Sequence, residues 1–337
     1  MSLNITVLGA GGMGTAMAVL LCGNGHSVTL WDRKPALLDE IRKTGANSRY
    51  LDGIAVQQEI MLETDDFKAL KAADMVVFAV PSQAFPDVFA RLAKSIKKDA
   101  VCVNVAKGIE QKSLKRLSEI AADIRPELKY VLLSGPSHAE EIGLGMPTTV
   151  TAASSDIEAA EAVRTAFSND FFRVYVNEDL LGAELGGALK NVIALACGVS
   201  DGLGYADNSK AALMTRGIAE MKRLGLAMGA DGNSFSGLTG IGDLIVTCTS
   251  MHSRNRRCGI FIGQGQSPAE AIEKVGAVVE GAFAAKAASE LAAKYNVDMP
   301  ITTALERILE GRISPADAAK ELLAKSSARE TEDTETK

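Results

Sequence analysis

Short apolar runs alternate with helical segments through the first half of the chain. The apolar runs, rich in β-branched residues, cover residues 4–10, 26–32, 75–80, 100–106, 130–134, 148–153 and 172–176. Segments with helical periodicity, such as 15–25 and 114–124, lie between most of them. Continuous apolar strands that alternate with helices are typical of a parallel sheet covered on both faces. The pattern therefore predicts an α/β domain.

The pattern changes near residue 180. From Leu180 to about Ala324 nearly all of the chain has helical character, interrupted by glycine-rich turns, and we expect no further strand. We predict a first domain over residues 1–180 and an all-helical second domain over 181–325. Residues 326–337 are polar with no apolar face, which predicts a disordered tail.

Composition excludes several classes of function. A net charge of −6 argues against a general nucleic-acid-binding protein, which needs a basic surface. The five cysteines never occur as C-x-x-C and there are three histidines, so we expect reduced thiols and no metal site. The N-terminus has no signal-sequence pattern, and no apolar run approaches the length of a membrane span. We expect a cytoplasmic protein with no membrane span.

A glycine-rich turn, GAGGMG, joins the first strand to the first helix in the spacing G-x-G-x-x-G. Gly9 permits the tight turn, Gly11 lets the backbone approach a pyrophosphate, and Gly14 lets helix and strand pack closely. The pyrophosphate would lie at the helix N-terminus. Asp32 ends the second strand, where an acid can accept hydrogen bonds from the adenosine ribose. The first domain is therefore predicted to bind a dinucleotide.

A lysine lies inside the apolar helical segment GALKNVIALACGV, residues 187–199. The nearest acids, Glu184 and Asp201, are not one helical turn from Lys190, so it has no partner along the helix. Burial of an ammonium is costly, but it lowers the pKa toward neutrality, which suits a group that exchanges a proton. The alternative is a surface lysine whose stem covers apolar neighbours.

Two further stretches follow predicted strands at their carboxyl ends, where open α/β sheets bind ligands. Lys107 follows the run 100–106. In SGPSHAEEI, Ser137 and Glu140 have the spacing of a capping box, which would begin a helix at the same edge.

A third polar stretch lies in the helical half. Asp243 is followed by Ser253, Arg254 and Asn255, and this serine, guanidinium and amide resemble a clamp for a phosphate or a carboxylate. We interpret Asp243 as a counter-charge for Lys190, with a helix cap as the alternative. The next residues, Arg256 and Arg257, are expected at the surface.

Together these motifs resemble those of the NAD(P)-dependent glycerol-3-phosphate dehydrogenases of the bacterial cytoplasmic type. The resemblance extends to about Glu280 and rests on GAGGMGTAMA, NVAKGIE, SGPSHAEE, ALKNVIALACGVSDGLGYADNSKAALMTRG, GLTGIGDLIVTCTS, SRNRR and VVEG. It implies a Rossmann-type doubly wound, mostly parallel sheet, followed by an all-α domain of the 6-phosphogluconate-dehydrogenase-like kind, usually in a homodimer. It also implies interconversion of dihydroxyacetone phosphate, a phosphorylated triose, and sn-glycerol 3-phosphate for phospholipid synthesis.

The resemblance also implies roles for residues. Lys190 would be the catalytic proton acceptor when the alcohol is oxidised. Residues implied to contact the substrate are Lys107, Gly135, Ser137, Asp243, Ser253, Arg254 and Asn255. Residues implied to contact the coenzyme are Gly12, Met13, Arg33, Tyr50, Lys107, Ala139, Arg254, Val278 and Glu280. Three positions depart from the family's usual pattern: Met13, where an aromatic residue is common, Asp52, where the family has proline, and Asp32, where many members have a small or neutral residue.

Two other interpretations stay open. A β-hydroxyacid or ketopantoate reductase would share the architecture and a lysine in the helical domain. A catalytically silent dinucleotide-binding sensor would need the glycine turn but not Lys190, Asp243 and Arg254 together. For the coenzyme, Asp32 would repel a 2′-phosphate, whereas Arg33 would hold it. We expect both NADH and NADPH to work, with NADH modestly preferred.

Overall fold

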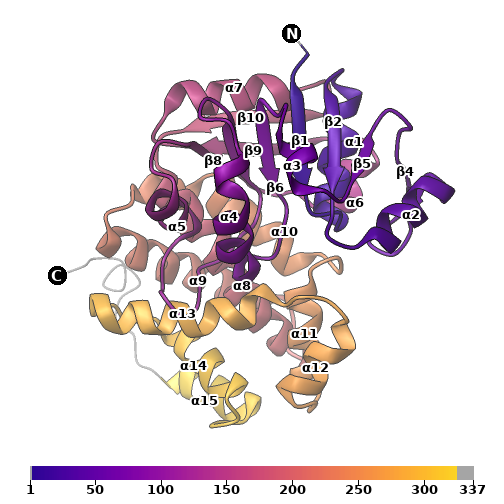
Figure 1. Ribbon diagram of the computed structural model, residues 1–337. Helices are drawn as coiled ribbons and strands as arrows, with labels where there is room; N and C mark the ends of the chain where they lie inside the picture. The colour runs from indigo at the N-terminus through magenta and orange to yellow at the C-terminus, as the bar shows by residue number, and fades with distance from the viewer. Residues whose placement is uncertain (1, 325–337) are drawn as a thin grey trace. The chain divides into compact units, whose positions relative to one another are not determined.

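The computed structural model of the chain describes residues 2–324, which form two compact units (Figure 1). Unit 1 contains residues 2–106 and 117–180, and unit 2 contains residues 107–116 and 181–324. The segment 107–116, predicted to lie in the first domain, therefore belongs to unit 2. The predicted tail, residues 326–337, lies outside the described residues.

Unit 1 is built on an eight-stranded sheet with the order β10-β9-β8-β7-β6-β1-β2-β5. Its strands are β1 (Asn4–Leu8), β2 (Ser27–Trp31), β5 (Met61–Glu63), β6 (Met75–Phe78), β7 (Val101–Asn104), β8 (Lys129–Ser134), β9 (Thr148–Ala153) and β10 (Phe172–Asn177). All neighbours pair in parallel except β8 and β9. The order from β5 to β8 is that of a Rossmann sheet, 3-2-1-4-5-6. The predicted mostly parallel, doubly wound sheet is confirmed.

Three strands were not predicted, because each is short and lacks a continuous apolar run. They are β5 at one edge of the large sheet, and β3 (Ala46–Asn47) and β4 (Leu51–Ala55), which pair in a separate two-stranded sheet.

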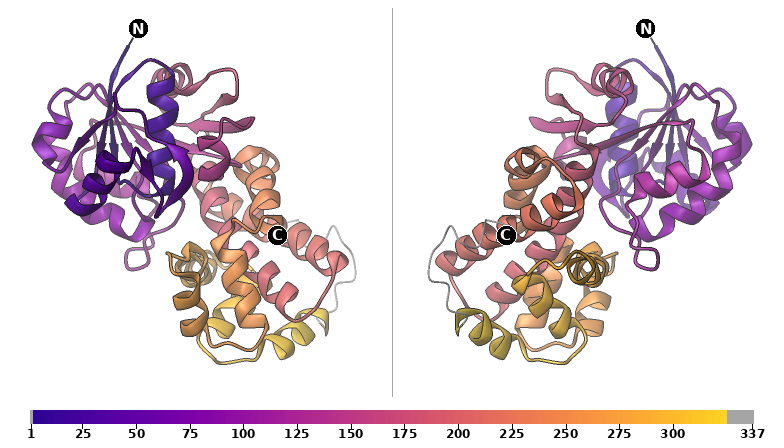
Figure 2. Two further views of the ribbon diagram at one scale, coloured as in Figure 1. Left: turned by 90° about the vertical axis from the view of Figure 1, so that its right-hand side faces the viewer. Right: turned by 90° about the vertical axis from the view of Figure 1, so that its left-hand side faces the viewer.

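Helices cover both faces of the large sheet (Figure 2). The helices of unit 1 are α1 (Gly12–Gly23), α2 (Pro35–Thr44), α3 (Asp66–Leu70), α4 (Phe85–Leu92), α5 (Leu117–Ile124), α6 (Ala139–Gly143) and α7 (Ile157–Phe167). Successive side chains of β1 point to opposite faces of the sheet. Ile5 and Val7 pack on one face in a core with α1, α2 and α7, whereas Leu8 packs on the other face in a core with α3, α4 and α5. This alternation is why a strand buried on both faces is continuously apolar.

The described part of unit 2 is helical apart from one isolated β-bridge between Ile109 and Arg116. Its helices are α8 (Leu180–Gly202), α9 (Asp207–Met228), α10 (Asp243–Thr249), α11 (Arg254–Gly263), α12 (Pro268–Val275), α13 (Glu280–Tyr295), α14 (Pro300–Leu309) and α15 (Pro315–Ala324). The expected all-α second part is confirmed.

Helix α8 is the central helix of unit 2, because two hydrophobic cores meet on it. Leu189 and Ile193 belong to one core, and Val192 and Leu195 to the other. Among the described residues it is the one helix long and apolar enough to resemble a membrane span, although no such span was expected. However, 83% of its most apolar window is buried inside the structure, as expected for a core helix.

A glycine contact brings α8 and α11 unusually close. Gly198 and Gly202 on α8 face Gly259 and Gly263 on α11, and a Cβ atom at Gly259 would lie 2.1 Å from the carbonyl oxygen of Leu195. No other residue fits this approach. The glycines are spaced i, i+4 on both helices, and the two helices run in the same direction. The first turn of α11, which precedes Gly259, therefore lies beside the middle of α8, where Asn255 bonds to Asn191.

Candidate active site

The turn between β1 and α1 has the geometry of an anion site. Gly9 has a φ of +106°, and a Cβ atom at Gly14 would lie 1.8 Å from the Gly9 carbonyl oxygen, so both positions require glycine. Beside Gly11 the space is open, because a Cβ atom there would meet nothing within 4 Å. No side chain caps the N-terminus of α1 and its first turn holds no acid, which leaves N–H groups for an anion. These features fit a dinucleotide pyrophosphate.

Asp32 makes two hydrogen bonds at the end of β2. Its Oδ2 accepts from the backbone N–H of Ala10 and its Oδ1 from that of Lys34, both at 2.9 Å. The carboxylate therefore ties the glycine-rich turn to β2, a structural role that the sequence did not indicate. A carboxylate has about four acceptor positions, so a ribose hydroxyl can still bind; this contact stays a prediction.

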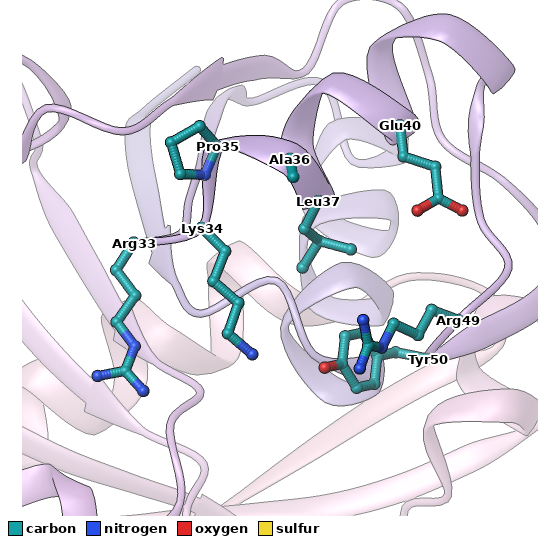
Figure 3. A pocket seen from close by; sticks show the side chains of 8 residues that line it. All are labelled: Arg33, Lys34, Pro35, Ala36, Leu37, Glu40, Arg49 and Tyr50. Atoms are coloured by element: carbon teal, nitrogen blue, oxygen red, sulfur yellow. The ribbon is translucent and has the colours of Figure 1, made fainter.

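A cationic pocket of about 400 Å³ opens at the start of α2 (Figure 3). It is lined by Arg33, Lys34, Pro35, Ala36, Leu37, Glu40, Arg49 and Tyr50. The Arg49 guanidinium lies 5.4 Å from the centre of the Tyr50 ring. In Figure 3 the Arg33 and Lys34 side chains both extend toward the bottom of the view, with the Lys34 side chain nearer to Tyr50. Three cations against one acid favour a phosphate group in this pocket.

The stretch after β8 differs from its prediction. The Ser137 hydroxyl donates to the carbonyl oxygen of Gly135 at 2.8 Å, and α6 begins at Ala139 without a side-chain cap. The predicted capping box of Ser137 and Glu140 is therefore wrong, because the serine hydroxyl closes its own turn instead. Ala139 lies beside Gly12, whose Cβ atom would be 3.7 Å away, so this stretch borders the glycine-rich turn. Met13, on the first turn of α1, packs partly against the core.

Unit 2 holds a buried cluster of two lysines and one aspartate. Lys190, whose side chain is 7% exposed, donates from Nζ to Oδ1 of Asp243 at 2.6 Å and to Oγ1 of Thr247 at 2.7 Å. Lys107 donates to the other carboxylate oxygen of Asp243 at 2.6 Å. The Thr247 hydroxyl donates in turn to the Asp243 carbonyl oxygen at 2.6 Å. The structure thus joins three predicted residues, and the counter-charge of Lys190 is Asp243.

Each member comes from a different part of unit 2. Lys190 lies in the middle of α8, and Asp243 begins α10 directly after a π-helical turn, Leu238–Gly242. Such turns are frequent at functional sites. Thr247 follows Asp243 by one helical turn on the same face. It was missed, although a polar residue four positions after a candidate acid in an apolar helix is a signal that could have identified it.

The segment 107–116 carries Lys107 to this cluster. At its far end Arg116 donates to Glu184 of α8 at 2.7 Å, and both side chains are largely buried. Ile109 of the same segment lies in the core that also contains Leu189. Arg116 therefore anchors the far end of the segment to α8, and burial of Ile109 fixes the part next to Lys107, which holds Lys107 against Asp243.

The charges of the cluster shift its acid–base properties. Burial lowers the pKa of Lys190 to about 8; the Asp243 carboxylate raises it, and the Lys107 ammonium lowers it. Burial also opposes ionisation of Asp243, but the two ammonium groups outweigh burial and hold the pKa of Asp243 below its usual range. Lys190 can therefore exchange a proton near neutral pH beside a permanently charged aspartate.

The predicted anion clamp lies at the start of α11. Ser253 is the N-cap residue, and its Oγ accepts from the backbone N–H of Arg256 at 3.2 Å. Arg254, the first helical residue, is exposed. Asn255 is buried: its Nδ2 donates to Oδ1 of Asn191 at 2.9 Å, and its Oδ1 accepts from the N–H of Gly281 at 2.8 Å. The amide therefore links α11 to α8 and α13.

The bond to Gly281 also places the start of α13 beside the clamp, together with the half-buried Val278 and Glu280. Contacts of these residues with substrate or coenzyme stay predictions. One expectation is wrong: Arg256 and Arg257 are not surface residues but are half-buried, and Arg256 pairs with Asp201.

Comparisons with known proteins cover both units. The family descriptions "NAD-dependent glycerol-3-phosphate dehydrogenase N-terminus" and "C-terminus" match residues 4–160 and 179–320. Proteins named glycerol-3-phosphate dehydrogenase (NAD(P)+) from Bacillus velezensis and Lysinibacillus sphaericus are each 49% identical over 98% of this chain, and over 96% and 98% of their own lengths. The crystal structure of glycerol-3-phosphate dehydrogenase from Coxiella burnetii is 35% identical with a TM-score of 0.93, over 96% of this chain and 99% of that one. These matches confirm the resemblance in the motifs.

Proposed function

Because the chain belongs to the NAD-dependent glycerol-3-phosphate dehydrogenase family, we propose that it interconverts dihydroxyacetone phosphate and sn-glycerol 3-phosphate with Lys190 as the proton-transfer group. It is an NAD(P)-dependent oxidoreductase. The observation that carries the assignment of Lys190 is its burial against Asp243 and Thr247, with a pKa of about 8. The reductase alternatives lose support because relatives at 49% identity carry the dehydrogenase name. A silent sensor would not need this cluster.

The geometry of the Lys190 ammonium leaves one N–H for substrate. An ammonium has three donors, and Asp243 and Thr247 accept two of them. The Thr247 hydroxyl donates its hydrogen to the Asp243 carbonyl oxygen, so it can only accept a hydrogen bond from Lys190. The remaining N–H is therefore directed away from these two partners.

The third N–H of Lys190 is the one that exchanges a proton with the substrate. The bound coenzyme supplies the hydride in reduction and accepts it in oxidation. In reduction the Lys190 ammonium donates its proton to the oxygen of the C2 carbonyl, and in oxidation the neutral amine accepts the proton of the C2 hydroxyl. Lys107, fixed on the other side of Asp243, adds a positive charge that favours an oxygen with developing negative charge.

We assign the substrate phosphate to the first turn of α11. The exposed Arg254 guanidinium and the N-terminal end of the helix dipole both favour an anion. The glycine contact with α8 brings this turn beside the part of α8 that carries Lys190, as the Asn255–Asn191 hydrogen bond also requires.

Replacing Arg254 by alanine should raise KM for dihydroxyacetone phosphate with a smaller effect on kcat. The guanidinium would contact the non-reacting end of the substrate, so it stabilises ground state and transition state alike. A charge-assisted hydrogen bond contributes about 1.5–3 kcal/mol, or roughly ten- to a hundredfold in KM. Steady-state kinetics measures this, with phosphate-free dihydroxyacetone as the matched control substrate. An unchanged KM for the phosphate substrate would place the phosphate elsewhere.

Oxidation of NADH or NADPH by the purified protein tests the function directly. Dihydroxyacetone phosphate should be reduced with a kcat/KM at least about a hundred times that for ketopantoate or tartronate semialdehyde, because only it presents a phosphate to the α11 site. A preference for either acid would instead favour the reductase interpretation. Tight coenzyme binding without turnover of any of the three would indicate a sensor.

Coenzyme preference should be modest and should favour NADH. The Asp32 carboxylate opposes a 2′-phosphate, and the neighbouring cationic pocket of Arg33, Lys34 and Arg49 attracts it. Removal of the repulsive group by Asp32→Gly should shift the ratio of kcat/KM toward NADPH, and Arg33→Ala should reduce kcat/KM for NADPH more than for NADH. The two ratios from initial rates measure both effects. A wild-type preference for NADPH of about tenfold or more would mean that the cationic pocket dominates.

We further propose that the protein acts in the cytoplasm as a homodimer and supplies the glycerol phosphate backbone of phospholipids. This proposal rests on the family to which the chain belongs. Light scattering coupled to size-exclusion chromatography tests the dimer: a mass close to the 35.4 kDa of one chain would contradict it.

A further inference from the structure

Arg256 occupies an unusual position in the first turn of α11. It follows the clamp residues directly, yet its side chain is only 13% exposed. Its Nε and Nη2 atoms each lie 2.8 Å from Oδ2 of Asp201. Its Nη1 donates to the carbonyl oxygen of Thr249 at 2.8 Å and contacts the sulfur of Met251 at 3.2 Å. The guanidinium is thus held by protein groups at all three of its nitrogens.

These partners lie on the helices that form the acid–base cluster. Asp201 is in the last turn of α8, the helix of Lys190, and Thr249 ends α10, the helix of Asp243. One planar guanidinium therefore connects the ends of both helices to the first turn of α11.

The same residue is fixed at its backbone. Its N–H donates to Oγ of Ser253, the cap of α11, and its carbonyl oxygen packs on Gly198, where a Cβ atom would be 2.1 Å away. Gly198 and Asp201 both belong to α8, so the backbone and the side chain of Arg256 each contact this helix. Together they leave the first turn of α11 little freedom to shift along α8.

Asp201 accepts a second cation on its other oxygen. Lys210 of α9 lies 3.0 Å from Oδ1 of Asp201, and its side chain is 16% exposed. The two cations differ in geometry: Lys210 is a point charge with one partner, whereas Arg256 forms a planar, several-bonded contact that sets an orientation. Lys210 therefore offers a matched control at the same carboxylate.

We propose that Arg256, anchored on Asp201, is a positioning residue that holds the phosphate-binding turn of α11 in register with Lys190. The inference rests on the proposed function, because it assumes that the first turn of α11 binds the substrate phosphate. Loss of the anchor should loosen the phosphate end of the site and leave the Lys190–Asp243–Thr247 contacts in place.

Arg256→Lys tests this, since it keeps the charge but cannot reach Asp201 and Thr249 together. Its KM for dihydroxyacetone phosphate should rise about tenfold or more, a scale expected from a small misplacement of a binding group. Its kcat/KM for phosphate-free dihydroxyacetone should change by less than about twofold, and Lys210→Gln should change neither value by more than this. Asp201→Asn should reproduce the effect of Arg256→Lys. Calorimetric titration with sn-glycerol 3-phosphate should show the same weakening in the equilibrium constant.

The outcomes separate the inference from the function on which it rests. Equal losses of kcat/KM for dihydroxyacetone phosphate and dihydroxyacetone would overturn the inference, because the effect would then lie at Lys190 or in the stability of the whole unit. Unchanged KM in both Arg256→Lys and Asp201→Asn would overturn it as well. Failure of the wild-type protein to reduce dihydroxyacetone phosphate would instead reject the proposed function. Thermal unfolding of each variant shows whether it is folded. If Arg256→Lys does not fold, Asp201→Asn provides the same test.

Discussion

Replacing Lys190 by alanine should lower kcat by about 10²–10⁴-fold, the range expected for a positioned acid–base group. Coenzyme binding should be retained, because the glycine-rich turn and Asp32 belong to unit 1. Arginine should not rescue the activity, since a guanidinium does not release its proton in this pH range. Steady-state kinetics and fluorescence titration with NADH measure the two effects separately.

The pH dependence provides a second measurement on the same residue. With a pKa of about 8, the rate of ketone reduction should fall as pH rises through this value, because the ammonium is the proton donor. The rate of alcohol oxidation should rise over the same interval, because the neutral amine is the acceptor. Lys286→Ala, at an exposed position of α13, is the matched control and should leave the pH dependence of both rates unchanged. The assignment fails if Lys190→Ala keeps more than about a tenth of the wild-type kcat.

Replacing Asp243 by asparagine should have the second-largest effect. The substitution leaves two ammonium groups, Lys107 and Lys190, around a neutral side chain in a buried site. Removing one partner of a buried ion pair costs about 3–5 kcal/mol, so denaturant unfolding should show a clear loss of stability. Since Asp243 raises the pKa of Lys190, its loss should lower that pKa further. The falling limb of the reduction rate should therefore move to lower pH.

At neutral pH the Asp243→Asn variant should reduce dihydroxyacetone phosphate about a hundredfold more slowly, because its lysine is less often protonated and less well oriented. Asp207→Asn, at an exposed acid in the first turn of α9, controls for the loss of one negative charge from unit 2. A falling limb that stays in place or moves to higher pH would show that Asp243 does not act on Lys190.

Several features of the site could be predicted from the sequence because they depend on local patterns. The G-x-G-x-x-G turn is local: its glycines are needed for contacts within one strand–turn–helix unit, such as that of Gly14 with Gly9. Lys190 was identified because a charged residue inside an apolar helical segment can be recognised from the adjacent sequence alone. Arg254 was identified because a serine, a guanidinium and an amide stand next to one another in the sequence, as in an anion clamp.

Other features depended on contacts between distant residues. Lys190 and Asp243 are 53 positions apart and Lys107 and Asp243 are 136 apart, and no periodic pattern encodes such pairs. The capping box failed because a serine hydroxyl can bond either to the next helix or to its own turn, and the alternatives differ by little free energy. Arg256 was placed at the surface because its partner, Asp201, is 55 positions away.

The sequence alone thus determined the elements and their order: a mostly parallel sheet with a dinucleotide turn, then a bundle of helices around α8. Those properties follow from backbone sterics and from periodic burial, which act over a few residues. Only the tertiary structure decided which charges meet. The glycine contact between α8 and α11 brings the clamp to α8, and the anchored segment 107–116 brings Lys107 to Asp243, the partner of Lys190. A buried ion pair exists only where packing excludes water around both partners, and packing is a property of the whole unit.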